Sequence, residues 1–356
     1  MSASPAGSDT LIQIAWITAQ ATLAGTALLL LIVFWMHWAR VVGEQRRRAF
    51  ISDWRPRLAA IALDCDAATV DTLPRLRRRD LDLFLMEWIA LHEALDTDAC
   101  QGLQSLNRKL GIARVARRLL RRRRLHDRLL GTIALGHAGD LAAFGTLLEE
   151  AQSENLPLSL AAARALVRLD PGRAVVELMP LIESREDWPH ARLWPLLQEV
   201  GPAALTGPLT RAIRSAAPHG QARLTRFLPL ADDVASQQLV RELIRAAPSD
   251  AVLASALGVV DSPDELPAIR RLTSHPRWHI RMLSAKALGR LGTRDDEPRL
   301  VAMLGDREWW VRYRASQALV ALPWLGKDRA REIQAGLSDR FAADAMEQAI
   351  AERGYQ

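Results

Sequence analysis

Apolar residues recur with a long and regular period from about residue 125 onward. Leucine returns seven times, and the separations are 31 residues with one exception of 29. These leucines are Leu135, Leu166, Leu197, Leu228, Leu257, Leu288 and Leu319. The fourth residue after each of them is Gly, Asp or Pro, which are residue types that end helices. The pattern therefore predicts a repeated unit in which one helix ends shortly after the leucine.

A second series of apolar residues runs between the first at the same spacing. Its members are Leu147, Leu178, Leu209, Val240, Ile269 and Leu300. Each unit therefore contains two amphipathic helices, and one such pair cannot bury its own apolar face. About seven units over residues 125–325 predict an α-solenoid. We expect an all-α protein, with a helical cap at 57–124 before the repeats and capping helices at 326–356 after them.

One uncharged segment near the N-terminus is long enough to cross a bilayer. Residues 11–39 contain no Asp, Glu, Lys or Arg, and tryptophans lie near both ends. Basic residues follow at 40–56, whereas the tail at 1–10 has no Lys or Arg. A cleaved signal peptide would begin with positive charge and have a shorter apolar core, so an uncleaved transmembrane helix is favoured. The positive-inside rule places the tail outside and the rest of the chain in the cytoplasm.

Two stretches in the last units resemble a known family. "HIRMLSAKALGRLG" (279–292) and "VRYRASQALVAL" (311–322) are similar to the second helix of short HEAT repeats of the phycobilisome-lyase type. The resemblance implies Asp–Arg ion pairs between units, here among Arg281, Asp306 and Arg312. The whole chain also resembles single-span HEAT-repeat proteins of the bacterial inner membrane. These tend to accompany glycosyltransferases that make envelope polysaccharides, which implies a membrane-protein partner.

Large aromatic residues concentrate where the last two units begin. The stretch "DREWWVRYR" contains two adjacent tryptophans, a tyrosine and three arginines, and Trp278 is the equivalent aromatic residue one unit earlier. Tryptophan, tyrosine and arginine are enriched at protein–protein hot spots. The predicted partner-binding surface consists of Trp278, Trp309, Trp310, Tyr313 and Arg314. Packing of the same residues between repeats is the alternative interpretation.

Positive charge comes almost entirely from arginine, and the formal net charge is +6. The base composition of a GC-rich genome explains such a bias, and attraction to phosphate, lipid headgroups or an acidic protein is the functional alternative. Two clusters are candidates for contact with anionic lipid. They are Arg40, Arg46, Arg47, Arg48, Arg121, Arg122, Arg123 and Arg124. Ordinary solvated helix faces are the alternative interpretation of both clusters.

Catalytic motifs are absent from the sequence. The sequence contains no HExxH zinc-binding motif, and neither a phosphate-binding loop nor a nucleophile motif occurs. Cys65 and Cys100 have no metal-type spacing either. We therefore expect no enzyme activity, no metal or other cofactor, and no small-molecule substrate.

The sequence thus predicts a non-enzymatic scaffold, held at the membrane by residues 11–39, whose cytoplasmic solenoid binds a protein. Tethering would strengthen weak contacts by raising the effective concentration of the partner. A basic solenoid that binds nucleic acid or anionic lipid is one alternative, although no nucleic-acid recognition motif is present. A lyase-like or other unrecognised enzyme is the second alternative.

Overall fold

The computed structural model describes residues 6–63, 73, 76–77, 80–95 and 101–354. Within its helices, the side chains of 6–15, 19, 62–63, 101–102 and 104–105 lie outside the described residues. Cys65, Cys100 and residues 1–5 of the predicted tail lie outside them as well. The described residues form α-helices and short 3-10 helices and no β-strand, which confirms the all-α prediction. The chain divides into two compact units, Met1–Leu119 and Leu120–Gln356.

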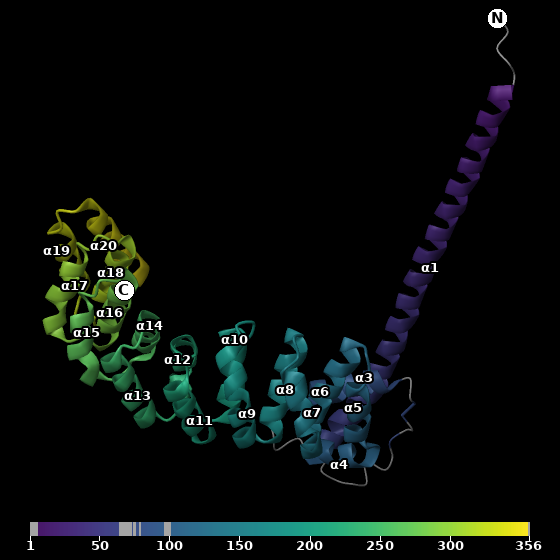
Figure 1. Ribbon diagram of the computed structural model, residues 1–356, viewed down its shortest axis with the longest axis horizontal. Helices are drawn as coiled ribbons and strands as arrows, with labels where there is room; N and C mark the ends of the chain where they lie inside the picture. The colour runs from purple at the N-terminus through teal and green to yellow at the C-terminus, as the bar shows by residue number, and fades with distance from the viewer. Residues whose placement is uncertain (1–5, 64–72, 74–75, 78–79, 96–100, 355–356) are drawn as a thin grey trace, which may run out of the picture. The chain divides into compact units, whose positions relative to one another are not determined.

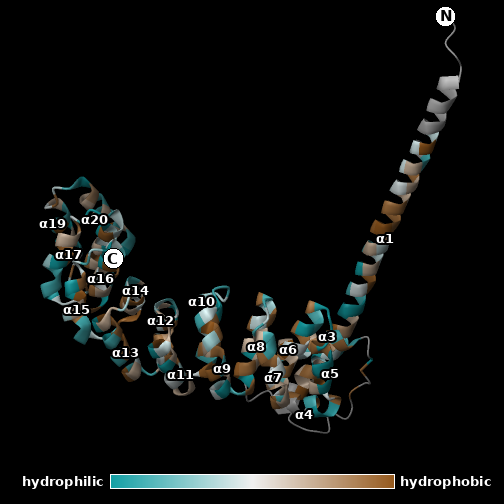
Figure 2. Cartoon of the chain, viewed as in Figure 1, coloured by the Kyte–Doolittle hydropathy of each residue, from teal (hydrophilic) through white to brown (hydrophobic). Residues whose placement is uncertain are grey.

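The first unit begins with one long helix, α1, which runs from Ala6 to Leu63 (Figure 1). Every described side chain from Trp16 to Val42 is exposed, including the large apolar residues in that stretch. Figure 2 shows apolar residues along this part of α1 and charged residues closer to α3. In the described part of the chain, α1 is the one helix that is long and apolar enough to cross a membrane. The expected apolar helix is therefore present.

The C-terminal part of α1 is packed rather than exposed. It contacts α3 (Leu81–Ala94) and α4 (Gln101–Leu110), and α5 (Ile112–Leu120) follows them. Its buried residues are Phe50, Trp54, Leu58 and Ile61, whose spacing of three or four places them on one helix face. The edge of one ring meets the face of the other where Trp54 contacts Phe84 of α3, with ring centroids 5.3 Å apart. The predicted basic segment at 40–56 is thus part of α1 and continues into the packed end of that helix.

The second unit is a row of helix pairs in two layers (Figure 1). The first layer contains α6 (Leu125–Ala138), α8 (Leu156–Leu169), α10 (His190–Val200), α12 (Pro218–Thr225), α14 (Asp250–Val259), α16 (Trp278–Leu291), α18 (Trp309–Ala321) and α20 (Arg340–Arg353). The second layer contains α7 (Phe144–Ala151), α9 (Pro171–Ser184), α11 (Pro202–Ser215), α13 (Asp233–Ala246), α15 (Leu266–Leu272), α17 (Glu297–Met303) and α19 (Lys327–Ala335). Short 3-10 helices lie between them: η3 (Leu141–Ala143), η4 (Leu228–Leu230), η5 (Pro263–Glu265) and η6 (Arg294–Asp296). This arrangement agrees with the solenoid-like stack that the leucine period predicts.

Both predicted series of apolar residues, called the first and second ladder from here on, lie in the core of the second unit. The seven leucines of the first ladder are at most 1% exposed, and the six residues of the second are at most 4% exposed. One position departs from the expected helix, because Leu228 lies in η4 and not in an α-helix. The cause is Pro229, which has no backbone N–H and disfavours the α conformation at the preceding residue. The single interval of 29 residues follows this break.

The first layer packs most closely where a glycine of one helix faces an alanine of the next. Gly136 of α6 faces Ala165 of α8, and Gly289 of α16 faces Ala318 of α18. A Cβ added to either glycine would lie 2.8 Å from the facing Cα, closer than real Cβ atoms approach. Each glycine directly follows one ladder leucine, and each alanine directly precedes the next. Glycine is therefore required at these two junctions.

The junction between α14 and α16 has the same residue pair but a different geometry. Gly258 follows Leu257, and Ala287 precedes Leu288, so the pair has the same place in the period. No atom of a neighbouring helix lies within 4 Å of a Cβ added to Gly258. The α14–α16 junction is therefore open where its two equivalents are closed.

Replacement of Gly258 with alanine should raise the free energy of unfolding by about 0.5 kcal/mol, because alanine favours helix and its methyl group meets open space. The matched replacement Gly289→Ala should lower it by about 1–3 kcal/mol, since the new methyl group collides with Ala318. Urea unfolding of both variants measures the two changes. Changes of the same sign would contradict the difference between the junctions.

Candidate functional site

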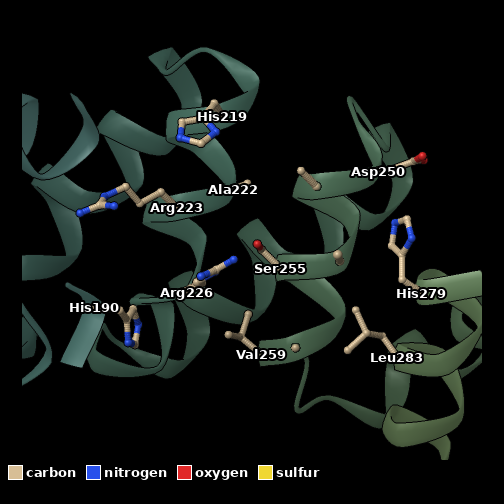
Figure 3. A pocket seen from close by; sticks show the side chains of 13 residues that line it. His190, His219, Ala222, Arg223, Arg226, Asp250, Ser255, Val259, His279 and Leu283 are labelled. Carbon is tan, nitrogen blue, oxygen red and sulfur yellow. The ribbon is translucent and has the colours of Figure 1, made fainter. Parts of the chain in front are cut away.

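A groove of about 820 Å³ crosses four helices of the first layer, α10, α12, α14 and α16 (Figure 3). We call it the α10–α16 groove. On α14 it is lined by small residues at helical spacing, namely Ala251, Ala254, Ser255, Gly258 and Val259. The open junction at Gly258 is part of this groove, so the missing contact between α14 and α16 is what makes room for it.

The α12 side of the groove is positively charged. Arg226, which directly follows α12, is exposed, and no carboxylate of the described residues pairs with it. Arg223 is half-buried, and its Nε donates to the backbone carbonyl of Ile182 at 2.6 Å while Nη2 donates to that of Trp188 at 2.5 Å. Burial and the nearby Arg226 charge lower the pKa of Arg223, and Glu186 and Asp187 offset this only in part. Arg223 is therefore held beside a second cation.

An aromatic group adjoins these arginines. The ring of His190 stacks on Phe227 with centroids 4.5 Å apart, and Trp194 lies 5.6 Å from the same imidazole. Nε2 of His190 is buried without a hydrogen-bond partner among the described residues. Burial, followed by the charges of Arg226 and Arg223, lowers the pKa of His190. The neutral imidazole is thus favoured in this wall of the groove.

The remaining charged residues of the groove already have partners. Asp250 pairs with Arg277 at 3.1 Å, and His219 lies 3.6 Å from Glu186. The α16 side contributes His279 and Leu283. The groove therefore combines an apolar floor with a cationic wall. Sequence analysis missed it, and the sequence marks this region only by the 29-residue interval beside Pro229.

The predicted aromatic surface is assembled on α18. Trp309 and Trp310 are 44% and 51% exposed, and the rings of Trp309 and Tyr313 stack with centroids 5.1 Å apart. Trp278 heads the neighbouring helix α16 and is 38% exposed. Its ring meets that of His279, a groove residue, edge-on at 5.8 Å. The three tryptophans thus leave large ring surfaces open to solvent.

The other two predicted residues of this surface, Tyr313 and Arg314, form hydrogen bonds within the helix stack. The Tyr313 hydroxyl lies 3.1 Å from a carboxylate oxygen of Glu352 on α20, and Nε2 of Gln317 donates to both groups. Partial burial and the hydrogen bond with Glu352 raise the pKa of Tyr313. Arg314 donates to Gln317 at 2.6 Å. Packing therefore accounts for Tyr313 and Arg314, whereas it leaves half of each α18 tryptophan uncovered.

Arg281 and Asp306 form a bidentate ion pair between consecutive units. Nε and Nη2 of Arg281 donate to the two carboxylate oxygens of Asp306 at 2.7 and 2.8 Å, and both side chains are nearly buried. Burial raises the pKa of Asp306, but the hydrogen bonds from Arg281 and from the backbone N–H of Glu308 outweigh it and hold the pKa below its ordinary value. This geometry is that of the Asp–Arg ion pairs between units that the family resemblance implies.

The ion pair predicted for Arg312 has a different form in the structure. Its Nη1 donates to the backbone carbonyl of Asp306 at 2.8 Å and does not reach the carboxylate. The physical reason is that Arg281 already occupies both carboxylate oxygens. The guanidinium of Arg312 also lies over the ring of Phe341 at 5.7 Å. Arg312 therefore braces the turn before α18 and contacts α20.

Among the unpredicted ion pairs between units, two have a nearly buried carboxylate. Arg241 pairs with Glu265 of η5 at 2.6 Å, and Arg270 pairs with Asp296 of η6 at 2.7 Å. The two carboxylate side chains are 3% and 1% exposed. Each arginine directly follows a residue of the second ladder, which is the signal that could have revealed both pairs.

The arginines proposed for lipid contact are all exposed. Three of them contact carboxylates of the chain: Arg46 pairs with Asp80, Arg48 with Glu44, and Arg122 with Asp127. Contact of the cluster with anionic lipid stays a prediction.

Comparison with protein families bears on the second unit. Residues 241–320 match the family described as HEAT repeats. The match extends from α13 into α18, so the HEAT resemblance is confirmed for the last units. For the units before residue 241, and for the single-span bacterial relatives, it stays a prediction. HEAT repeats generally mediate protein–protein interaction.

One similar solved structure is the crystal structure of an engineered protein. It is 14% identical, the alignment covers 83% of this chain and 92% of that chain, and the TM-score is 0.34. A likeness of this size carries no argument about function. No curated protein matches the chain.

Replacement of Arg281 with methionine should lower the free energy of unfolding by about 3 kcal/mol, because it leaves the nearly buried carboxylate of Asp306 without its cation. The control Arg314→Met removes an arginine that donates only to Gln317 of its own helix, and should cost less than about 1 kcal/mol. Urea unfolding of both variants gives the comparison. Equal losses in the free energy of unfolding would show that the Arg281–Asp306 pair stabilises the protein no more than Arg314 does.

Proposed function

We propose that this protein is a membrane-anchored, non-enzymatic scaffold whose HEAT-repeat unit binds a membrane protein at the cytoplasmic face. The observation that carries the proposal is the set of half-exposed tryptophans at the start of α16 and α18, within the residues that match HEAT repeats. Tryptophan concentrates at binding hot spots because it buries a large area with few rotatable bonds.

The anchor in this proposal is the exposed apolar part of α1. From Trp16 to Val42 the helix would span about 40 Å, more than the hydrocarbon core of about 30 Å. A helix satisfies its own backbone hydrogen bonds, so it tolerates lipid along this length. The arginines that follow favour a cytoplasmic location for the rest of the chain. A place in the bacterial inner membrane, beside a glycosyltransferase complex for envelope polysaccharide, rests on the family resemblance.

The anchor can be tested by placing charge in it. The full chain should stay with membranes during alkaline carbonate extraction. The double variant Leu29→Arg/Leu31→Arg should pass largely to the soluble fraction, since each central arginine opposes insertion by about 3 kcal/mol. Leu29→Ala/Leu31→Ala is the matched control and should remain in the membrane. Release of the control, or retention of the arginine variant, would count against a span here.

The partner surface can be tested by photo-crosslinking in intact cells. A photo-reactive residue in place of Trp310 should capture an integral membrane protein, because that ring is half-exposed in the HEAT repeats. The same residue in place of Val234, which is 75% exposed on the second layer, should not capture it. Capture from both positions or from neither would refute the tryptophan surface.

A further inference from the structure

We propose that the α10–α16 groove binds an acidic peptide segment of a protein partner. The inference deepens the proposed function, because it rests on the partner being a protein, and it assigns the recognition to a second surface. Three features of the groove carry it: the charge of its α12 wall, the shape of its floor and the absence of the glycine–alanine contact between α14 and α16.

The charge of the groove wall calls for an anion. Arg226 has no carboxylate partner among the described residues, and it lies close enough to Arg223 and His190 to disfavour the charged form of both. Arg223 cannot swing away, because two backbone carbonyls hold its guanidinium. The groove's own carboxylate, Asp250, is already paired with Arg277. A carboxylate from outside would therefore reduce the repulsion that Glu186 and Asp187 offset only in part.

The shape of the groove fits a length of polypeptide. Its volume of about 820 Å³ is far larger than a single inorganic anion needs. The small residues of α14 let a backbone approach closely, and Gly258 leaves open the space that an alanine fills at the equivalent junctions. Val259 and Leu283 add apolar contacts beside the cations. A segment that alternates acidic and apolar side chains satisfies both parts of this lining.

The α14–α16 opening also distinguishes this junction from the two others that have the same residue pair. At the α6–α8 and α16–α18 junctions the glycine is covered by an alanine of the next helix. At Gly258 the same residue pair is present and the cover is missing. The second layer still ties these two units together through Arg241 and Glu265. The space therefore opens only on the first layer, toward the groove, while the units stay joined.

The experiment uses the full chain in detergent micelles and a short fluorescein-labelled peptide in which glutamate alternates with leucine. Fluorescence anisotropy should show binding that weakens about tenfold in Arg226→Glu. Arg271→Glu makes the same charge change on the second layer, outside the groove, and should change the Kd by less than about twofold. Gly258→Phe should also weaken binding, because its ring fills the groove. Thermal unfolding checks that each variant is folded, and Arg226→Gln provides a milder second variant.

Two control ligands separate the proposed occupant from others. A peptide with lysine in place of glutamate should not bind. Inorganic phosphate, at matched ionic strength, should displace the peptide no better than chloride does. Equal weakening by Arg226→Glu and Arg271→Glu, displacement by phosphate alone, or tighter binding of a single-stranded oligonucleotide would each overturn the proposal.

The result is also independent of the crosslinking at Trp310. If peptide binding depends on Arg226 and Trp310 captures nothing, the groove proposal is supported and the tryptophan surface is refuted. If Trp310 captures a membrane protein and the peptide binds without regard to Arg226, the proposed function stands and the groove assignment falls.

Discussion

The second unit depends on one constraint: no helix pair can bury its own apolar face. The leucine, valine and isoleucine residues of both ladders are buried only because each unit packs against the next. Such packing is non-directional, so it does not by itself fix how neighbouring units are aligned. The buried ion pairs supply that alignment, since Arg241, Arg270 and Arg281 each reach a carboxylate of the following unit. Stacking energy and register thus come from different residues.

The junctions of the first layer differ in how closely their helices pack, and this difference opens the α10–α16 groove. At the α6–α8 and α16–α18 junctions the helices meet through glycine and alanine, whereas at α14–α16 the same two residue types do not touch. Ion pairs reach across junctions of both layers, as Arg241 with Glu265 and Arg281 with Asp306 show. The units that contain α14 and α16 are joined by Arg241 with Glu265 and by Arg277 with Asp250, but the α14–α16 junction is open at Gly258. A row with uniform spacing would have no groove there.

Exposed apolar area serves two purposes in the function that we propose. Along α1 it surrounds the helix, as lipid requires, and it ends at Val42, before the exposed arginines that precede the packed face. On α16 and α18 it is confined to a few tryptophan rings beside polar groups, which is typical of a protein-binding surface. The cationic groove adds charge to that surface, so the two together would favour a partner with both apolar and acidic residues.

The sequence by itself determined those features that follow from the repeat period and from the length of the uncharged segment. The 31-residue ladders predicted the helix pairs, the uncharged run predicted the exposed apolar helix, and the family resemblance implied Asp–Arg pairs among Arg281, Asp306 and Arg312. Only the tertiary structure decided whether Gly258 touches Ala287, which oxygen Arg312 reaches, and that Leu228 lies in a 3-10 helix. The physical reason is that these outcomes depend on ångström-scale distances between units. Gly136, Gly258 and Gly289 stand at equivalent places in the period, yet only two of the three are covered.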